Sequence, residues 1–188
     1  MTAQRADARR NYARILAVAE EEVAAHGADA SLEQIARTAG VGSATVRRHF
    51  PSRRALLEAV FGERIEKLCA YAEELAGTPD ARAALLDWLR ALTTYAASAR
   101  GMADALLPDG VADPDHVNAC SAKLTESADP LLRNAARAGA VAPGVTVADL
   151  VTLVTGIVLA TEHHPDPAAE AHRLLDVTVA GVSPRFTR

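Results

Sequence analysis

Residues 31–50 read SLEQIARTAGVGSATVRRHF, and this stretch indicates the structure of the N-terminal part of the chain. The pattern predicts two short helices joined by a glycine-containing turn. Two helices joined in this way form a helix-turn-helix, whose second helix enters the major groove in proteins that read DNA. Because cations crowd the second helix, the pattern predicts double-stranded DNA as the partner.

The first of these helices carries its own start and stop signals. Ser31 is placed to accept a hydrogen bond from a first-turn N–H, and Gln34 to reach back to the Ser31 N–H, as in a capping box. Gly40 follows where a left-handed residue ends a helix. In the turn we expect Val41 to fill the space between the helices, and Gly42 to be required because a Cβ would hinder the backbone. One apolar stripe joins Leu32, Ile35, Ala36 and Ala39.

The second helix has one apolar face and one polar face. Val46 and Phe50 share a face and are expected to pack inward. The opposite face then meets base edges, where Arg48 can grip guanine and Thr45 can use its hydroxyl or methyl group. The residues predicted from this rotation to contact DNA are Ser43, Ala44, Thr45, Arg47, Arg48 and His49.

The stretch from Asn11 to Leu57 resembles the N-terminal domain of the tetracycline-repressor (TetR/AcrR) family. A leading helix with a periodic apolar stripe precedes the quoted residues, and FPSRRAL, residues 50–56, directly continues them. The resemblance implies an all-α chain. It assigns residues 1–52 to a helix-turn-helix DNA-binding domain and residues 53–188 to a helical ligand-binding and dimerisation domain.

Two positions depart from the family pattern. The family most often has Tyr where this chain has Arg47, and Lys followed by an acidic residue where it has Arg53 and Arg54. By resemblance the Tyr and Lys positions touch DNA phosphates. We therefore expect Arg47 and Arg53 to keep phosphate contacts, with a geometry that differs from that of the usual residues.

Charge is divided unevenly along the chain. The net charge of the 188 residues is −4. Residues 1–54 hold nine basic and six acidic side chains, and the remaining residues hold 11 basic and 18 acidic ones. Only the N-terminal part is therefore basic, as a DNA-binding segment requires. The 49% of hydrophobic residues with only 4% aromatic ones favours a helical core of Ala, Leu and Val.

The sequence suggests a cytoplasmic protein. Its N-terminus is rich in Arg and has no apolar core of a secretory signal. The stretch from Leu150 to Thr161 is apolar but far shorter than the roughly 20 residues that span a bilayer. Cys69 and Cys120 do not form a disulfide framework, and reduced thiols are expected.

After Pro51, helical spacing predicts a long helix that connects the two domains. A following helix from Asp80 is expected to end near Gly101. Trp88 and Tyr95 share one face of that helix, a spacing more typical of a core, yet the resemblance implies a small-molecule cavity among these helices. The residues expected around an apolar cavity are Ile65, Cys69, Trp88, Leu92, Tyr95, Cys120 and Leu124.

Two further helices are expected near the C-terminus, before and after the break at His163 to Pro167. In the family the last two helices pair with their copies in a four-helix bundle, so we expect a homodimer. The alternative is that their apolar stripes only complete the core of one chain. The predicted dimer residues are Leu150, Leu153, Val154, Ile157, Val158, Thr161, Leu174, Leu175 and Thr178.

The sequence as a whole favours a dimeric repressor that a small, largely apolar ligand releases from a palindromic operator. A metal- or redox-responsive regulator is an alternative, because His116 and Cys120 have a helical ligand spacing. A DNA-binding protein without a ligand is another. No paired-carboxylate, Ser-His-Asp or phosphate-loop pattern is present in the sequence, so neither catalysis nor a cofactor is expected.

Overall fold

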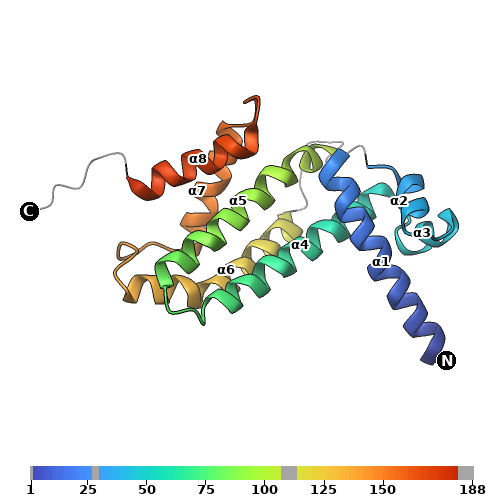
Figure 1. Cartoon of the computed structure of the whole chain (residues 1–188), viewed down its shortest axis with the longest axis horizontal. Helices are drawn as coiled ribbons and strands as arrows, with labels where there is room; N and C mark the ends of the chain where they lie inside the picture. The colour runs from blue at the N-terminus through green and yellow to red at the C-terminus, as the bar shows by residue number, and fades with distance from the viewer. Residues whose placement is uncertain (1, 27–29, 107–113, 182–188) are drawn as a thin grey trace, which may run out of the picture. The chain divides into compact units, whose positions relative to one another are not determined.

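The computed structural model describes residues 2–26, 30–106 and 114–181, and the side chains of residues 7–26, 30–98 and 122–181. Within these ranges every regular element is an α-helix, which confirms the all-α prediction (Figure 1). In the part of the chain that the structure describes, no helix is long and apolar enough to cross a membrane. The helices are α1 (Thr2–His26), α2 (Leu32–Thr38), α3 (Ser43–His49), α4 (Arg53–Leu75), α5 (Ala81–Leu106), α6 (Pro114–Arg137), α7 (Val147–Ala160) and α8 (Pro167–Ala180).

The chain divides into two compact units. The first unit comprises Met1–Arg64 and Ala99–Pro114, and the second comprises Ile65–Ser98 and Asp115–Arg188. Each unit has its own cluster of buried apolar side chains, which we call the first and second clusters. The first cluster consists of Ile15, Leu16, Ala19, Val23, Ala30, Ile35, Ala36, Ala39, Val46, Phe50, Leu56, Leu57 and Val60.

Helix α4 supplies side chains to both clusters. Ser52 caps its N-terminus, because its Oγ accepts a hydrogen bond from the Ala55 N–H at 3.1 Å. Leu56 and Val60 lie in the first cluster, and Ile65 lies in the second. The structural boundary within this helix therefore falls after Arg64, whereas the sequence analysis placed a boundary before residue 53.

The second cluster is built around Trp88, which is fully buried. It consists of Ile65, Leu68, Cys69, Ala72, Ala84, Leu85, Trp88, Leu89, Leu92, Leu124, Ala128, Leu131, Leu132, Ala135, Val147, Val154, Ile157, Val158, Ala171 and Leu175. Its indole Nε1–H donates to the carbonyl of Leu68 in α4 at 3.2 Å, so the one polar atom of the ring is satisfied inside the core. Helices α4, α5 and α6 run alongside one another in this unit (Figure 1). The Asn134 side chain of α6 donates to the carbonyl of Ala76 at 2.8 Å and joins α6 to the end of α4.

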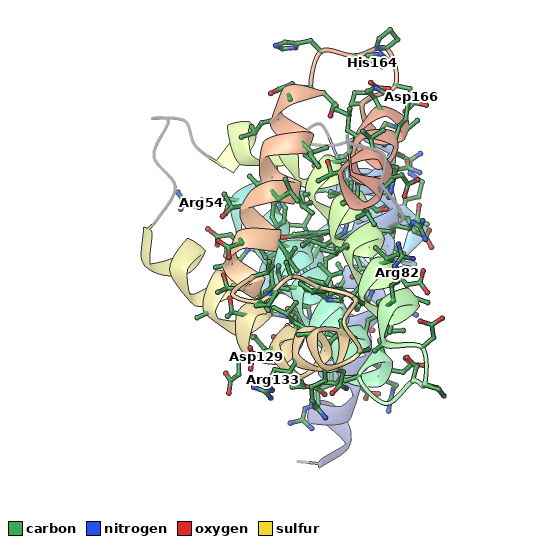
Figure 2. The ribbon with its side chains drawn as sticks, turned by 90° about the vertical axis from the view of Figure 1, so that its left-hand side faces the viewer. Arg54, Arg82, Asp129, Arg133, His164 and Asp166 are labelled. Atoms are coloured by element: carbon green, nitrogen blue, oxygen red, sulfur yellow. The ribbon has the colours of Figure 1, made fainter. Side chains whose placement is uncertain are left out.

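Helix α5 is longer than its sequence suggests. It continues to Leu106 without the break expected near Gly101. A glycine inside a helix costs only about 1 kcal/mol relative to alanine, which a long helix tolerates. On α6, Asp129 and Arg133 form an ion pair one turn apart on the outside of the helix (Figure 2).

Helices α7 and α8 form a hairpin in the second unit (Figure 1). The turn between them carries His164 and Asp166, and the Asp166 side chain caps α8 by accepting from the Ala169 N–H at 3.0 Å (Figure 2). Helix α8 also contacts α5 through two polar pairs. Arg90 pairs with Asp176 at 3.1 Å, and Thr94 shares a hydrogen bond with His172 at 3.0 Å.

A complete capping box begins α7. The Thr146 hydroxyl accepts from the Asp149 N–H at 3.1 Å, and the Asp149 carboxylate accepts from the Thr146 N–H at 2.9 Å. The Thr146 hydroxyl also donates to this carboxylate at 2.7 Å. These hydrogen bonds from Thr146 hold the pKa of Asp149 below its ordinary value, so their contribution to stability is present at neutral pH and is lost as Asp149 becomes protonated in acid.

We expect Thr146→Ala to lower the free energy of unfolding by about 0.5–2 kcal/mol at neutral pH, because the N-cap oxygen is removed. Urea unfolding at one fixed protein concentration measures the change. Thr146→Ser is the matched control, since it keeps the hydroxyl and should stay close to the original chain. The difference in unfolding free energy between Thr146→Ala and Thr146→Ser should become smaller in acid. Equal stability of the two variants at pH 7 would contradict the capping role.

Candidate nucleic-acid interface

Helix α2 begins at a cap that draws on α1 as well as on its own residues. The Ser31 Oγ accepts from the Gln34 N–H at 3.3 Å, as predicted. The Gln34 side chain, however, does not accept from the Ser31 N–H; its Nε2 donates to the Thr38 hydroxyl at 3.3 Å. The Ser31 N–H instead donates to the carboxylate of Glu22 in α1 at 3.4 Å. The predicted capping box is therefore wrong in its second half, because a carboxylate from another helix takes the place of the Gln34 side chain.

The turn between α2 and α3 is a Schellman motif. The Gly40 N–H donates to the carbonyl of Arg37 at 3.1 Å, and the Val41 N–H donates to that of Ala36 at 3.0 Å. Gly40 has a φ of 62°, in the left-handed region that the sequence predicted. Val41 packs against the first cluster, which confirms its predicted position between the helices.

Gly42 has a different role from the one expected. It is the N-cap residue of α3, with φ −69° and ψ 146°, an extended conformation open to any residue. A Cβ built on Gly42 meets no atom within 4 Å. The expectation that a Cβ would hinder this part of the turn is therefore wrong, and Gly40 is the position in the turn where backbone geometry favours glycine.

Helix α3 turns its apolar residues inward and its polar residues outward. Val46 and Phe50 are 1% and 2% exposed and belong to the first cluster, as predicted. Ala44 and Arg48 lie on the exposed face, and Thr45 is half-buried. The remaining predicted DNA contacts are Ser43, Arg47 and Arg53, which are exposed, and His49, which is half-buried.

Cations gather at the end of α3 and the start of α4. Arg47 lies 3.5 Å from the carboxylate of Glu33 in α2, and both side chains are mostly exposed. Such an exposed pair contributes about 0–1 kcal/mol, so a phosphate can replace the carboxylate. Arg54 donates to Glu58 at 2.8 Å on α4, and Figure 2 shows Arg54 on the outside of the chain. Arg53 beside it is exposed.

A tyrosine that the sequence analysis did not single out also lies at this interface. Tyr12 of α1 stacks on Phe50 with ring centroids 5.2 Å apart and meets His49 edge-on at 5.9 Å. The spacing of the sequence could have identified it, because Tyr12 lies three and four residues before the buried Ile15 and Leu16 and so shares their face of the helix.

The predicted ligand-pocket residues lie together in the second cluster. Ile65, Cys69, Trp88, Leu92 and Leu124 are buried there, and Tyr95 packs against them half-buried. The side chain of Cys120 lies outside the described residues. The Trp88 N–H, expected as a polar handle for a ligand, is used by the Leu68 carbonyl. An open hollow of about 590 Å³ lies elsewhere in this unit, beside Pro79 to Arg82 and Ala138 to Ala140.

The predicted dimer residues fall into three groups by their burial within one chain. Five of them, Val154, Ile157, Val158, Thr161 and Leu175, are buried in this unit. Leu150 and Leu174 are half-buried, whereas Leu153 and Thr178 are exposed. Other apolar side chains on the same helices are more open: Leu159 is 59% and Val177 is 41% exposed. The apolar stripe recognised in the sequence is thus mainly the inward face of α7 and α8.

Two protein-family models match the chain. The model described as bacterial regulatory proteins, tetR family, matches residues 15–60, and the model described as transcriptional regulator SbtR-like, C-terminal domain, matches residues 80–184. The first match includes the whole helix-turn-helix, and the second includes the helices that form the second cluster from α5 onward. No protein with a curated description matches the chain significantly.

Solved structures of TetR regulators resemble this chain over nearly its whole length. A TetR transcriptional regulator from Streptomyces coelicolor is 35% identical, with a TM-score of 0.74 over 93% of this chain and 99% of that one. A TetR regulatory protein from Mycobacterium vanbaalenii is 32% identical, with a TM-score of 0.70 over 93% and 98% of the two chains. FadR from Bacillus subtilis, solved with stearoyl-CoA, is 20% identical with a TM-score of 0.57 over 92% and 100%, a likeness of fold.

The two glycines of the turn provide a matched pair of substitutions. Gly40→Ala should lower the free energy of unfolding by about 1 kcal/mol, because it forces a left-handed backbone on a residue with a Cβ. Gly42→Ala should lower the free energy of unfolding by less, since the backbone of Gly42 is extended and the space around it is open. Chemical unfolding followed by circular dichroism measures both. An equal loss in the two variants would show that φ at position 40 is not the deciding constraint.

Proposed function

Because the chain belongs to the TetR family of bacterial transcriptional regulators, which bind DNA, we propose that it acts in the cytoplasm as a dimeric repressor of a palindromic operator. The observation that carries the proposal is the division of α3 into a buried face with Val46 and Phe50 and an exposed face with Ala44 and Arg48. A helix that is anchored in this way can enter a major groove without loss of its packing.

We assign roles on α3 by the position of each side chain. Arg48 and Thr45 read base edges, since a guanidinium can bind guanine O6 and N7 together and a Thr can meet a base through its hydroxyl or methyl. Ala44 lies on the same face and allows close approach. Ser43, Arg47 and His49, with Arg53 of α4, contact phosphates and set the register of the helix.

The exposed sides of α7 and α8 support dimerisation. Leu153, Leu159 and Val177 expose apolar surface there, and Gly156 is also exposed. Small and apolar residues on an open helix face allow a second copy of the same helix to approach closely. A palindromic operator needs two recognition helices, which a symmetric dimer supplies.

The second cluster is the proposed place for a small, largely apolar ligand. It includes Ile65 and Leu68 of α4, whose N-terminal part carries Leu56 and Val60 of the first cluster. A ligand that favours one packing of this cluster would favour one setting of α4 and change operator affinity, and the operator would change ligand affinity by the same factor. Among the described residues no His, Cys, Asp and Glu side chains form a group of three that could hold a metal, and the side chains of His116 and Cys120 lie outside them.

Arg48→Ala should weaken binding to the selected operator by about 1–3 kcal/mol and relax the preference at one base step. The operator is first selected from a random DNA pool by the unmodified chain, and affinity is then titrated on it and on single-base variants. Arg47→Ala is the comparison: it should weaken binding to all sequences alike and reduce the slope of log affinity against log salt by about one. Arg82→Ala, exposed in the second unit, is the control. An equal loss on every sequence with Arg48→Ala would make Arg48 a phosphate contact.

Leu159→Asp should yield a folded monomer, because Leu159 is 59% exposed in one chain and a charge there meets water until a partner covers it. Ile157→Asp, two residues away on the buried side, should instead unfold the second unit. Sedimentation velocity gives the oligomeric state and circular dichroism the folded fraction. A folded dimer in Leu159→Asp would remove this face from the proposed interface.

A further inference from the structure

We propose that Tyr12 is a positioning residue for DNA binding: its ring holds the end of the recognition helix and fixes His49 in the orientation in which it meets a DNA phosphate. The proposal rests on the proposed function of α3. It adds a residue from α1, outside the helix-turn-helix, to the set that determines operator affinity.

Tyr12 precedes a buried turn of α1, but its own side chain is partly exposed. The next turn of α1 carries Ile15 and Leu16, both buried in the first cluster, so the backbone that presents Tyr12 is held firmly. Tyr12 as a residue remains 39% exposed. It therefore lies at the rim of the cluster, where a side chain can contact both the core and the residues that face DNA.

The ring contacts two consecutive residues at the point where α3 ends. Phe50 is the C-cap residue and lies nearly parallel to Tyr12, with an interplanar angle of 30°. His49 is the last residue of the helix and meets Tyr12 at 69°, close to a T-shaped arrangement. Stacked and edge-on arrangements are the two favourable geometries of aromatic pairs. One ring from α1 thus restrains both the backbone exit of α3 and the last side chain of its DNA-facing end.

Hydrogen bonding through Nε2 does not hold His49 in place. Its Nε2 atom is shielded from solvent and has no hydrogen-bond partner among the described residues. Because Nε2 is shielded, a phosphate that meets the imidazole in this orientation contacts the other ring nitrogen, Nδ1. The orientation of the imidazole in the free protein accordingly depends on its ring contacts with Tyr12 and Phe50.

The ligand chemistry at this point is that of a phosphate. His49 is one of three successive basic residues in the last turn of α3, after Arg47 and Arg48. A helix end with this charge favours an anion, and phosphate oxygens accept hydrogen bonds from imidazole N–H groups. Restricting the rotamer of His49 before binding removes an entropic cost of ordering it on the DNA.

The test is a double-mutant cycle on operator binding with Tyr12→Leu, His49→Ala and the double variant. Leu keeps apolar bulk at position 12 and removes the ring, and circular dichroism with thermal unfolding confirms that each variant is folded at the assay temperature. Tyr12→Leu alone should weaken operator binding about tenfold, and in the His49→Ala background the same change should have an effect of about twofold or less. Tyr12→Phe keeps the ring and should bind within about twofold of the unmodified chain.

Each other outcome overturns the proposal in a recognisable way. If Tyr12→Leu weakens binding equally with and without His49, Tyr12 acts independently of the imidazole. If Tyr12→Phe loses as much affinity as Tyr12→Leu, the hydroxyl itself contacts DNA. If the unmodified chain binds its selected operator and Tyr12→Leu binds it equally well, the positioning role of Tyr12 is wrong and the proposed function is unaffected. If the unmodified chain selects no DNA sequence, the proposed function falls and the positioning role falls with it.

Discussion

The burial of Val46 and Phe50 is the constraint on which the DNA-facing surface depends. Val46 lies on a seven-residue helix, Phe50 is the C-cap residue of that helix, and both side chains enter the first cluster. Because α3 is only about two turns long, two anchors suffice to set its rotation about its own axis. The direction of every other side chain on the helix follows from that rotation. The hydrophobic effect, which carries no sequence information, thereby determines which residues of α3 are exposed.

A second constraint lies in the connection between the two clusters. Helix α4 is continuous from Arg53 to Leu75, and its buried residues change from the first cluster to the second without a break in the helix. A change of packing around Ile65 or Leu68 therefore acts on a backbone that also carries Leu56 and Val60. A continuous helix of this kind gives a change of packing in the second cluster a direct route to residues of the first.

Most features that depend on neighbouring residues could be predicted from the sequence, with Gly42 and the continuation of α5 past Gly101 as exceptions, whereas contacts between distant residues were missed. The left-handed Gly40, the cap at Ser31 and the inward faces of α2 and α3 follow from local periodicity and turn chemistry. The Gln34 half of the capping box was wrong because Glu22, nine residues before Ser31, competes for the same N–H. Tyr12 was missed because its ring contacts join α1 to the end of α3. In α7 and α8, spacing identified an apolar stripe but could not tell which surface covers it, and most of that stripe packs within one chain.

The exposed face of α3 separates the stability of the protein from its choice of DNA. Ala44 and Arg48 contribute little to the first cluster, so they can be exchanged with small effects on folding. A new operator preference can then arise by single substitutions, without compensating changes in the core. A regulator built in this way can diverge after gene duplication, since two copies can acquire different DNA preferences while keeping the same buried scaffold.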